Sequence, residues 1–322
     1  MTEPRPSKWK ILTAFAIIYF VWGSTFLAIR IGVHEVPPLL LAAMRFLAAG
    51  IALYLWLRLK GTAGPTLRQW VGASVLGTLI FVLDYGCLFW AEQRIPSGVT
   101  AVVLATIPVF IALLEITVLR TQRLSFRLGL ALVSGILGVS ILVNRSFTFG
   151  EVPLDRAGAA ALLIASFTWS LATILTKKFP LPESKPMSAA AQMFSGGIQL
   201  VLLSILFGEW HGLHLGAVSW QAWVALFYLT TAGSIVGFTA YIWLLHYESP
   251  TKVGTYAYVN PLVAVALGYF VASEPIGVRT LLGTLLILVS VIAITTMRAK
   301  AAGHTVATAK PVIPELSGAE AE

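Results

Sequence analysis

Charged residues are scarce in this sequence. Of its 322 residues, 11% are charged and 57% are hydrophobic, and the mean hydropathy is +0.85. A soluble globular protein carries about 25% charged residues, so this chain has too few to cover a water-facing surface of its size. The composition predicts an integral membrane protein solvated by lipid. The formal net charge of +8 lies in short basic runs between apolar stretches, which indicates membrane boundaries and argues against binding to nucleic acid.

Groups for several kinds of chemistry are also missing. Cys87 is the one cysteine, which excludes an intrachain disulfide and leaves no metal-ligand spacing. The five histidines are scattered, and no Gly-Lys-Ser/Thr loop is present to hold the phosphates of ATP. The sequence therefore predicts a protein that is not an enzyme, uses no cofactor and holds no metal.

Long apolar runs dominate what is present. A helix that crosses the ~30 Å hydrocarbon core of a bilayer needs about 20 mostly apolar residues. Ten candidate runs lie between a short basic N-terminus, residues 1–10, and a polar tail, residues 298–322, whose composition predicts disorder. The predicted spans are residues 11–29, 39–57, 70–90, 98–119, 128–143, 158–176, 188–207, 220–245, 254–272 and 280–297.

The distribution of positive charge predicts the orientation. Ten spans place both chain ends on one side of the membrane. If that side is the cytoplasm, sixteen Lys and Arg residues lie in or beside the cytoplasmic segments. Among them are Arg5, Arg123, Lys177, Lys252 and Lys310. Because positive loops stay inside, we expect both termini in the cytoplasm of a bacterial-type inner membrane. The five on the other side are Arg30, Arg94, Arg145, Arg156 and Arg279.

The second half of the chain repeats the first. Trp22 and Trp169 open similar segments 147 residues apart, and further matches follow at an offset of 153 residues. Each half then holds five spans, in residues 11–145 and in residues 156–297. Because five is an odd number, the second half must cross the membrane in the opposite orientation to the first. Inverted repeats of this kind are a transporter architecture with the substrate site between the halves. The later matches pair Trp70 with Trp223, Trp90 with Trp243 and Pro108 with Pro261.

These features together resemble a known family. The two five-helix repeats and four short motifs are similar to EamA-type members of the drug/metabolite transporter superfamily over about residues 9–297. The resemblance implies ten helices around a central cavity and the export of amino acids, metabolites or drugs. The motifs are Trp22-Gly-Ser-Thr, Arg45-Phe-Leu-Ala-Ala-Gly, Pro96-Ser-Gly and Tyr258-Val-Asn-Pro261-Leu-Val.

Two charged residues fall inside predicted spans. Arg45 and Asp84 lie about 9 Å and about 12 Å below the same membrane boundary at 1.5 Å per helical residue. Because intramembrane charges usually face a cavity or a partner, we expect both to line the substrate cavity. There they would bind the two ends of a zwitterion or relay a coupling proton. The alternative is a permanent ion pair that joins their helices.

Other predicted site residues are polar, aromatic or helix-breaking. Tyr256 and Asn260 are four residues apart and share one helix face, although Asn260 could instead form a helix–helix hydrogen bond. Pro108 and Pro261 should kink their helices and free carbonyl oxygens towards the interior. The aromatic rings within spans could clasp an apolar or cationic part of a substrate, and core packing is the competing interpretation. These aromatic residues are Trp22, Tyr85 and Trp169.

The sequence therefore predicts a secondary transporter. We expect export of amino acids or related small polar or amphipathic metabolites or drugs by alternating access, with proton coupling through Asp84 as a hypothesis. The expected partners are the small-molecule substrate, protons and membrane lipid, in a monomer or a homodimer. The alternatives are an uptake permease or facilitator for a sugar or nucleoside-like metabolite, and a receptor without transport activity.

Overall fold

The computed structural model describes residues 6–120, 124–143, 155–176, 178–211, 213–248, 253 and 255–308. The regular secondary structure of these residues is entirely helical, and no strand occurs among them. Six cations used to orient the chain, and most of the expected tail, lie outside the described residues. The six are Arg5, Arg123, Arg145, Lys177, Lys252 and Lys310.

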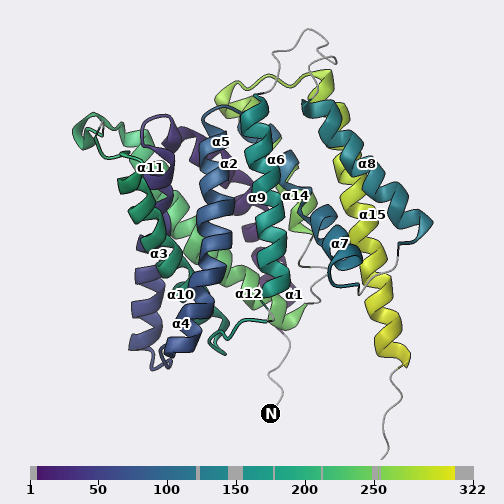
Figure 1. Cartoon of the computed structure of the whole chain (residues 1–322), viewed down its shortest axis with the longest axis horizontal. Coiled ribbons are helices and arrows are strands. Elements are labelled where there is room, and N and C mark those ends of the chain that lie inside the picture. The colour runs from purple at the N-terminus through teal and green to yellow at the C-terminus, as the bar shows by residue number, and fades with distance from the viewer. Residues whose placement is uncertain are drawn as a thin grey trace, which may run out of the picture.

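The described residues of the first half form five helical runs (Figure 1). Three of them are composite or broken. The first joins α1 (Lys8–Ala16), the π-helical segment η1 (Ile17–Val21) and α2 (Trp22–Val33), and the third joins α4 (Leu67–Gly77), η2 (Thr78–Tyr85) and α5 (Gly86–Glu92). The fourth is divided into α6 (Ser97–Leu104) and α7 (Ile107–Thr117). The two simple runs are α3 (Pro38–Leu59) and α8 (Phe126–Val143).

The described residues of the second half form five more long helical runs. The composite run is again the third of its half and contains a π-helical segment. It joins α11 (Trp220–Tyr228), η4 (Leu229–Val236) and α12 (Gly237–Tyr247), and the short 3₁₀ turn η3 (Leu215–Ala217) precedes it. The other runs are α9 (Arg156–Leu175), α10 (Lys185–Leu206), α14 (Tyr256–Ala272) and α15 (Val278–Thr308).

The helices are suited to a membrane, as the sequence predicts. Eight of the described runs are long and apolar enough to cross a bilayer, and α14 and most of α8 are shorter apolar helices. Each of the ten predicted spans coincides with one helical run. Large apolar side chains such as Phe270 and Leu202 are 80% and 61% exposed, which suits a lipid-facing surface.

Short polar side chains start several helices. Thr66 caps α4 and forms a capping box with Gln69, whose side chain accepts a hydrogen bond from the Thr66 N–H. Asp155, Ser184 and Ser219 cap α9, α10 and α11 by accepting a backbone N–H three residues on. These contacts satisfy N–H groups that a helix cannot pair internally, so they fix where the spans begin.

Two pairs of helices form the principal packing of the bundle. Helix α3 lies along α10, and α8 lies along α15. In Figure 1 the α8–α15 pair stands at one side of the bundle, and α1 begins and α15 ends at its lower end. We call this lower end the proximal end, and we call the opposite end, where α2 and α5 finish, the distal end.

Two predictions about the helices need correction. Pro108 does not kink a continuous helix, because α6 ends at Leu104 and Pro108 lies in the first turn of α7. Proline is tolerated there, since the first N–H groups of a helix have no internal partner. Pro261 does lie inside α14, so the two prolines occupy different helical positions. The tail was expected to be disordered from residue 298, but α15 continues to Thr308.

Candidate substrate site

The π-helical segments lie next to the residues predicted for the site. Segment η1 ends just before Trp22, and η2 contains Asp84 and Tyr85. Segment η4 contains Gly233 and Ser234. An inserted π turn displaces side chains from the regular helical positions, and such turns occur frequently at functional sites. Hydropathy along the chain does not predict these segments.

A buried arginine organises one group of side chains, which we call the arginine cluster. Arg45 on α3 is 2% exposed, and its Nε donates a hydrogen bond of 3.0 Å to the Ser234 hydroxyl. Its guanidinium carbon lies 4.7 Å from the ring centre of Phe46 and 5.3 Å from that of Tyr85. The Tyr85 ring in turn meets Trp169 edge-on at 6.2 Å. The Arg45 guanidinium is thus stabilised by one hydrogen bond and by cation–π contacts with two aromatic rings.

The arginine cluster leaves part of its charge without a partner. Among the described residues, Arg45 Nη1 has no hydrogen-bond partner. Neither a hydrogen bond nor an ion pair joins Arg45 to Asp84, so the permanent ion pair considered for these two residues is absent. Asp84 is itself 3% exposed. Arg45 therefore keeps unused hydrogen-bonding capacity in the buried interior, and Asp84 lies buried without an ion pair to it.

Three aromatic rings form a second group, the aromatic cluster. Trp22 lies 5.3 Å from Tyr241 and 5.0 Å from Tyr256, and the two tyrosine rings are 6.0 Å apart. Trp22 Nε1 donates a hydrogen bond of 3.1 Å to the Gly233 carbonyl. The rings come from α2, α12 and α14, so the aromatic cluster joins both halves of the chain.

Asn260 lies next to the aromatic cluster and links the helix that carries Tyr256 to the first helical run. It is 8% exposed. In the orientation that satisfies its amide, the nitrogen donates to the carbonyls of Tyr19 at 3.1 Å and Tyr256 at 3.2 Å. The contact with Tyr19 ties α14 to η1. This is the helix–helix role that the sequence left open for Asn260.

The two clusters meet at consecutive residues of η4. Gly233 accepts the bond from Trp22, and Ser234 accepts the bond from Arg45. Sequence reasoning missed Ser234 and Tyr241. The run Thr230-Thr-Ala-Gly-Ser234 inside an apolar span was the available signal, but small polar residues are also common in ordinary helix packing.

A cavity adjoins this meeting point. Its volume is about 930 Å³, and it lies between the first helical run, α3 and the η4–α12 junction towards the proximal end. None of the residues predicted for the site lines it. Ile235 and Val236, which follow Ser234 directly, belong to its wall. The other lining residues are Trp9, Lys10, Thr13, Ala14, Ile17, Ala52, Leu53, Trp56, Thr239, Ala240 and Trp243.

Two carboxylates hold helix starts together at the distal end. Glu35 accepts hydrogen bonds from the Ser219 hydroxyl and N–H, both at 2.5 Å, and these bonds lower the pKa of the Glu35 carboxyl. Glu209 accepts from the N–H groups of Leu39 at 3.2 Å and Leu40 at 2.8 Å. Burial nevertheless raises the pKa of Glu209, because desolvation outweighs those bonds.

An apolar helical bundle that buries charged and aromatic side chains beside an open pocket is typical of a membrane protein of the transporter class. The chain belongs to the EamA-like transporter family, whose model matches residues 8–144 and again residues 156–296.

Similar proteins agree with this membership. The chain is 35% identical to the uncharacterized inner membrane transporter YedA of Escherichia coli strain K12, over 96% of each chain. It is 24% identical to the uncharacterized transporter YoaV of Bacillus subtilis strain 168, over 86% of this chain and 94% of that one. A solved crystal structure shares the fold with a TM-score of 0.60 at 19% identity, covering 91% of this chain and 99% of the other. These relatives support a transporter role in the inner membrane.

Proposed function

We propose that this protein is a secondary active transporter that exports amino acids or related small amphipathic metabolites by alternating access. The observation that carries the proposal is the meeting of the arginine and aromatic clusters at Gly233 and Ser234, beside the cavity. A buried cation and a set of rings at one point suit a ligand with an acidic end and an apolar or cationic end.

Reciprocal contacts between α3 and α10 support inverted repeats. A Cβ placed on Gly50 would lie 2.9 Å from the Cα of Phe194, and one on Gly197 would lie 2.8 Å from the Cα of Leu47. Gly197 follows Gly50 by 147 residues, and Phe194 follows Leu47 by the same number. The contact of Gly50 with Phe194 is therefore repeated by their equivalents, Gly197 and Leu47. A two-fold axis between two like halves produces this reciprocal pattern.

The contact between α8 and α15 supports the same relation. A Cβ on Gly138 would lie 2.7 Å from Cγ1 of Ile287, and one on Gly283 would lie 2.5 Å from Cγ of Leu142. Both pairs of equivalents, 138 with 283 and 142 with 287, are 145 residues apart. We therefore assign residues 11–145 and 156–297 as two five-helix repeats. With the proximal end cytoplasmic, the excess of basic residues there supports the proposed orientation.

Each cluster has a proposed role. Arg45 binds the substrate carboxylate, because its Nη1 is buried and has no partner among the described residues. Trp22, Tyr256, Tyr85 and Trp169 enclose the rest of the ligand. Asp84 carries a coupling proton, since a buried carboxyl without an ion pair to Arg45 can change its charge during transport.

Counterflow in proteoliposomes tests this function. Unlabelled amino acids and metabolites are loaded inside, and uptake of the labelled compound is followed with and without an imposed pH gradient. We expect at least one acidic or zwitterionic compound to show counterflow and its net flux to respond to the gradient. Absence of counterflow across the library would refute transport, and flux that ignores the gradient would refute proton coupling.

The substrate role of Arg45 has its own test. Arg45→Ala should weaken substrate binding by about tenfold to a hundredfold, because a hydrogen bond to a charged group contributes about 1.5–3 kcal/mol. Arg94→Ala is the matched control, since Arg94 is exposed and lies over Trp90 at the distal end. Isothermal titration in detergent measures both variants, and equal affinities would remove Arg45 from the site.

A further inference from the structure

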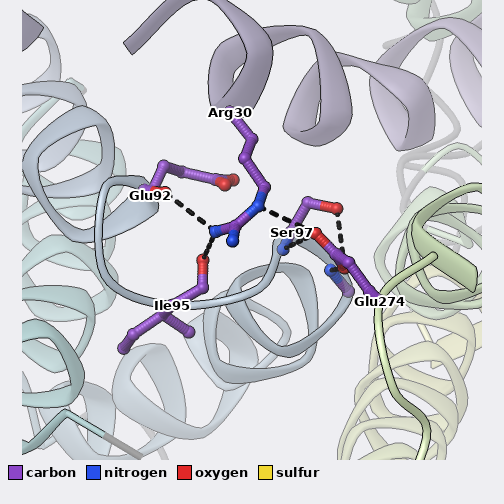
Figure 2. Close-up of polar contacts among 6 residues, drawn as sticks. Arg30, Glu92, Ile95, Ser97 and Glu274 are labelled. Carbon is purple, nitrogen blue, oxygen red and sulfur yellow. Dashed lines mark hydrogen bonds and ion pairs between the residues drawn. The ribbon is translucent and has the colours of Figure 1, made fainter. Parts of the chain in front are cut away.

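A polar cluster closes the distal end of the bundle (Figure 2). Arg30, in the last turns of α2, donates from Nη1 to the main-chain carbonyls of Glu92 at 3.0 Å and Ile95 at 2.6 Å. Its Nε forms an ion pair of 3.1 Å with Oε1 of Glu274. One arginine thus joins α2 to the α5–α6 connection and to the segment that follows α14.

Glu274 is fully engaged in this contact. Its carboxylate accepts hydrogen bonds from the N–H of Ser97 at 2.8 Å, the hydroxyl of Ser97 at 3.1 Å and the N–H of Gly98 at 3.2 Å (Figure 2). The start of α6, where these donors lie, favours a negative charge. Glu274 therefore suits the ionised state and fastens the second half of the chain to the first.

Glu92 presents the opposite situation. Its side chain is 0% exposed, and neither of its carboxyl oxygens has a hydrogen-bond partner among the described residues. The carboxyl lies within electrostatic reach of Arg30 and Glu274, and Figure 2 shows it near the guanidinium. An ionised carboxylate buried without donors is strongly disfavoured. The arrangement therefore fits the neutral acid, with Arg30 committed to Glu274.

We propose that Glu92 is a proton-binding site that controls closure of the distal end. With the proton bound, Arg30 pairs with Glu274 and the contacts of Figure 2 hold. When the proton leaves, one cation faces two buried carboxylates and the cluster becomes net negative. Hydration then stabilises the cluster, so water enters and the distal ends of α2, α5 and α14 separate.

The surrounding titratable groups are accounted for. Arg30 from α2 and Glu274 from beyond α14 are the charges that act on the Glu92 carboxyl. On α9, Asp155 is engaged in capping, since it accepts the N–H of Gly158 at 2.7 Å. The remaining charged or titratable groups on or next to the elements that pack against α5 are His34 after α2, three residues of α3 (Arg45, Tyr54 and Arg58), Asp84 and Tyr85 on η2, and Arg156 on α9.

This site deepens the proposed function and depends on it for its physiological meaning. In an exporter that opens outward, the substrate leaves while Glu92 is ionised and hydrated. A proton from the outside then neutralises Glu92 and allows the distal end to close. The return to the inward-facing state carries that proton, and its release to the cytoplasm before the distal end reopens couples export to proton entry.

Solvent access to the region below the cluster tests the proposal without a substrate. In a Cys87→Ser background, Thr100→Cys places a thiol on α6, at a fully buried position whose hydroxyl has no hydrogen-bond partner among the described residues. Labelling by a membrane-impermeant maleimide is followed from pH 5 to pH 8.5. His34→Cys, at an exposed position of the same end, normalises for the pH dependence of thiol ionisation.

The variants give opposite expectations. The normalised labelling rate should rise with pH by about tenfold or more, as a minor open state becomes populated. Glu92→Gln, which mimics the neutral acid, should keep labelling low at every pH. Glu274→Gln should keep it high, because Arg30 loses its partner. Glu35→Gln, a change in an exposed carboxylate at the same end, should leave the pH profile unchanged.

The outcomes separate this proposal from the transport function. A flat profile in the parent protein, or a pH-dependent one in Glu92→Gln, would overturn the proton site. If counterflow occurs while labelling is flat, transport stands and the site at Glu92 falls. If labelling titrates through Glu92 while no compound shows counterflow, the site stands and the proposed transport function falls.

Discussion

The close approach of α3 and α10 can be tested by adding one methyl group on either side. Gly50 and Gly197 sit where a Cβ would lie within 3.0 Å of the facing backbone. Such a contact cannot be relieved by rotating a side chain, so the two helices must separate. Overpacking of this kind costs about 1–3 kcal/mol. We expect Gly50→Ala and Gly197→Ala to be destabilising by similar amounts, because their contacts are reciprocal.

A matched control isolates the contact from helix propensity. Alanine is favoured over glycine in a helix interior by about 1 kcal/mol, which partly offsets the overpacking. Gly129 on α8 has nothing within 4 Å of an added Cβ, so Gly129→Ala should show the propensity gain alone. The difference in unfolding free energy between Gly197→Ala and Gly129→Ala should be about 1–3 kcal/mol.

Equilibrium unfolding in mixed detergent micelles, followed by circular dichroism, measures these differences. The double variant Gly50→Ala and Gly197→Ala should cost less than the sum of the two single changes, since one separation of the helices relieves both contacts. The reasoning would be refuted if both single variants were as stable as Gly129→Ala.

Two further predictions concern polar contacts. Ser234→Ala should destabilise the protein by about 1–3 kcal/mol in the same unfolding assay, because it leaves Arg45 Nε buried without an acceptor. Ser140→Ala, which alters an exposed hydroxyl on α8, should be nearly neutral, and equal effects would contradict this. Hydrogen bonds from Ser219 lower the pKa of Glu35 below its usual 4.5, so their stabilisation is present above that pH and is lost as the pH falls through the lowered value. The difference in melting temperature between the parent and Glu35→Gln should shrink below pH 4.5, and a difference that widened there would show that the sign is wrong.

The sequence pointed to those members of the clusters whose residue type is rare within a membrane span. Arg45, Asp84 and Asn260 are polar residues in apolar spans, and each proves to be buried. Their partners could not be deduced, because a contact such as Arg45 with Ser234 joins residues 189 positions apart. Glu92 shows the limit most clearly. A carboxylate at the end of a span would ordinarily be hydrated at the membrane interface, whereas packing buries Glu92 completely.

Composition and hydropathy were enough to assign the class of this protein. Low charge and ten apolar runs require a helical membrane bundle, because each backbone polar group in lipid must be satisfied within its own segment. Three further features became visible once the helices were packed together. They are the contacts between intramembrane groups, the positions of the π-helical segments, and the contrast between the shielded Glu92 and the fully hydrogen-bonded Glu274. These outcomes depend on how side chains from distant segments pack, and hydropathy along the chain does not contain that information.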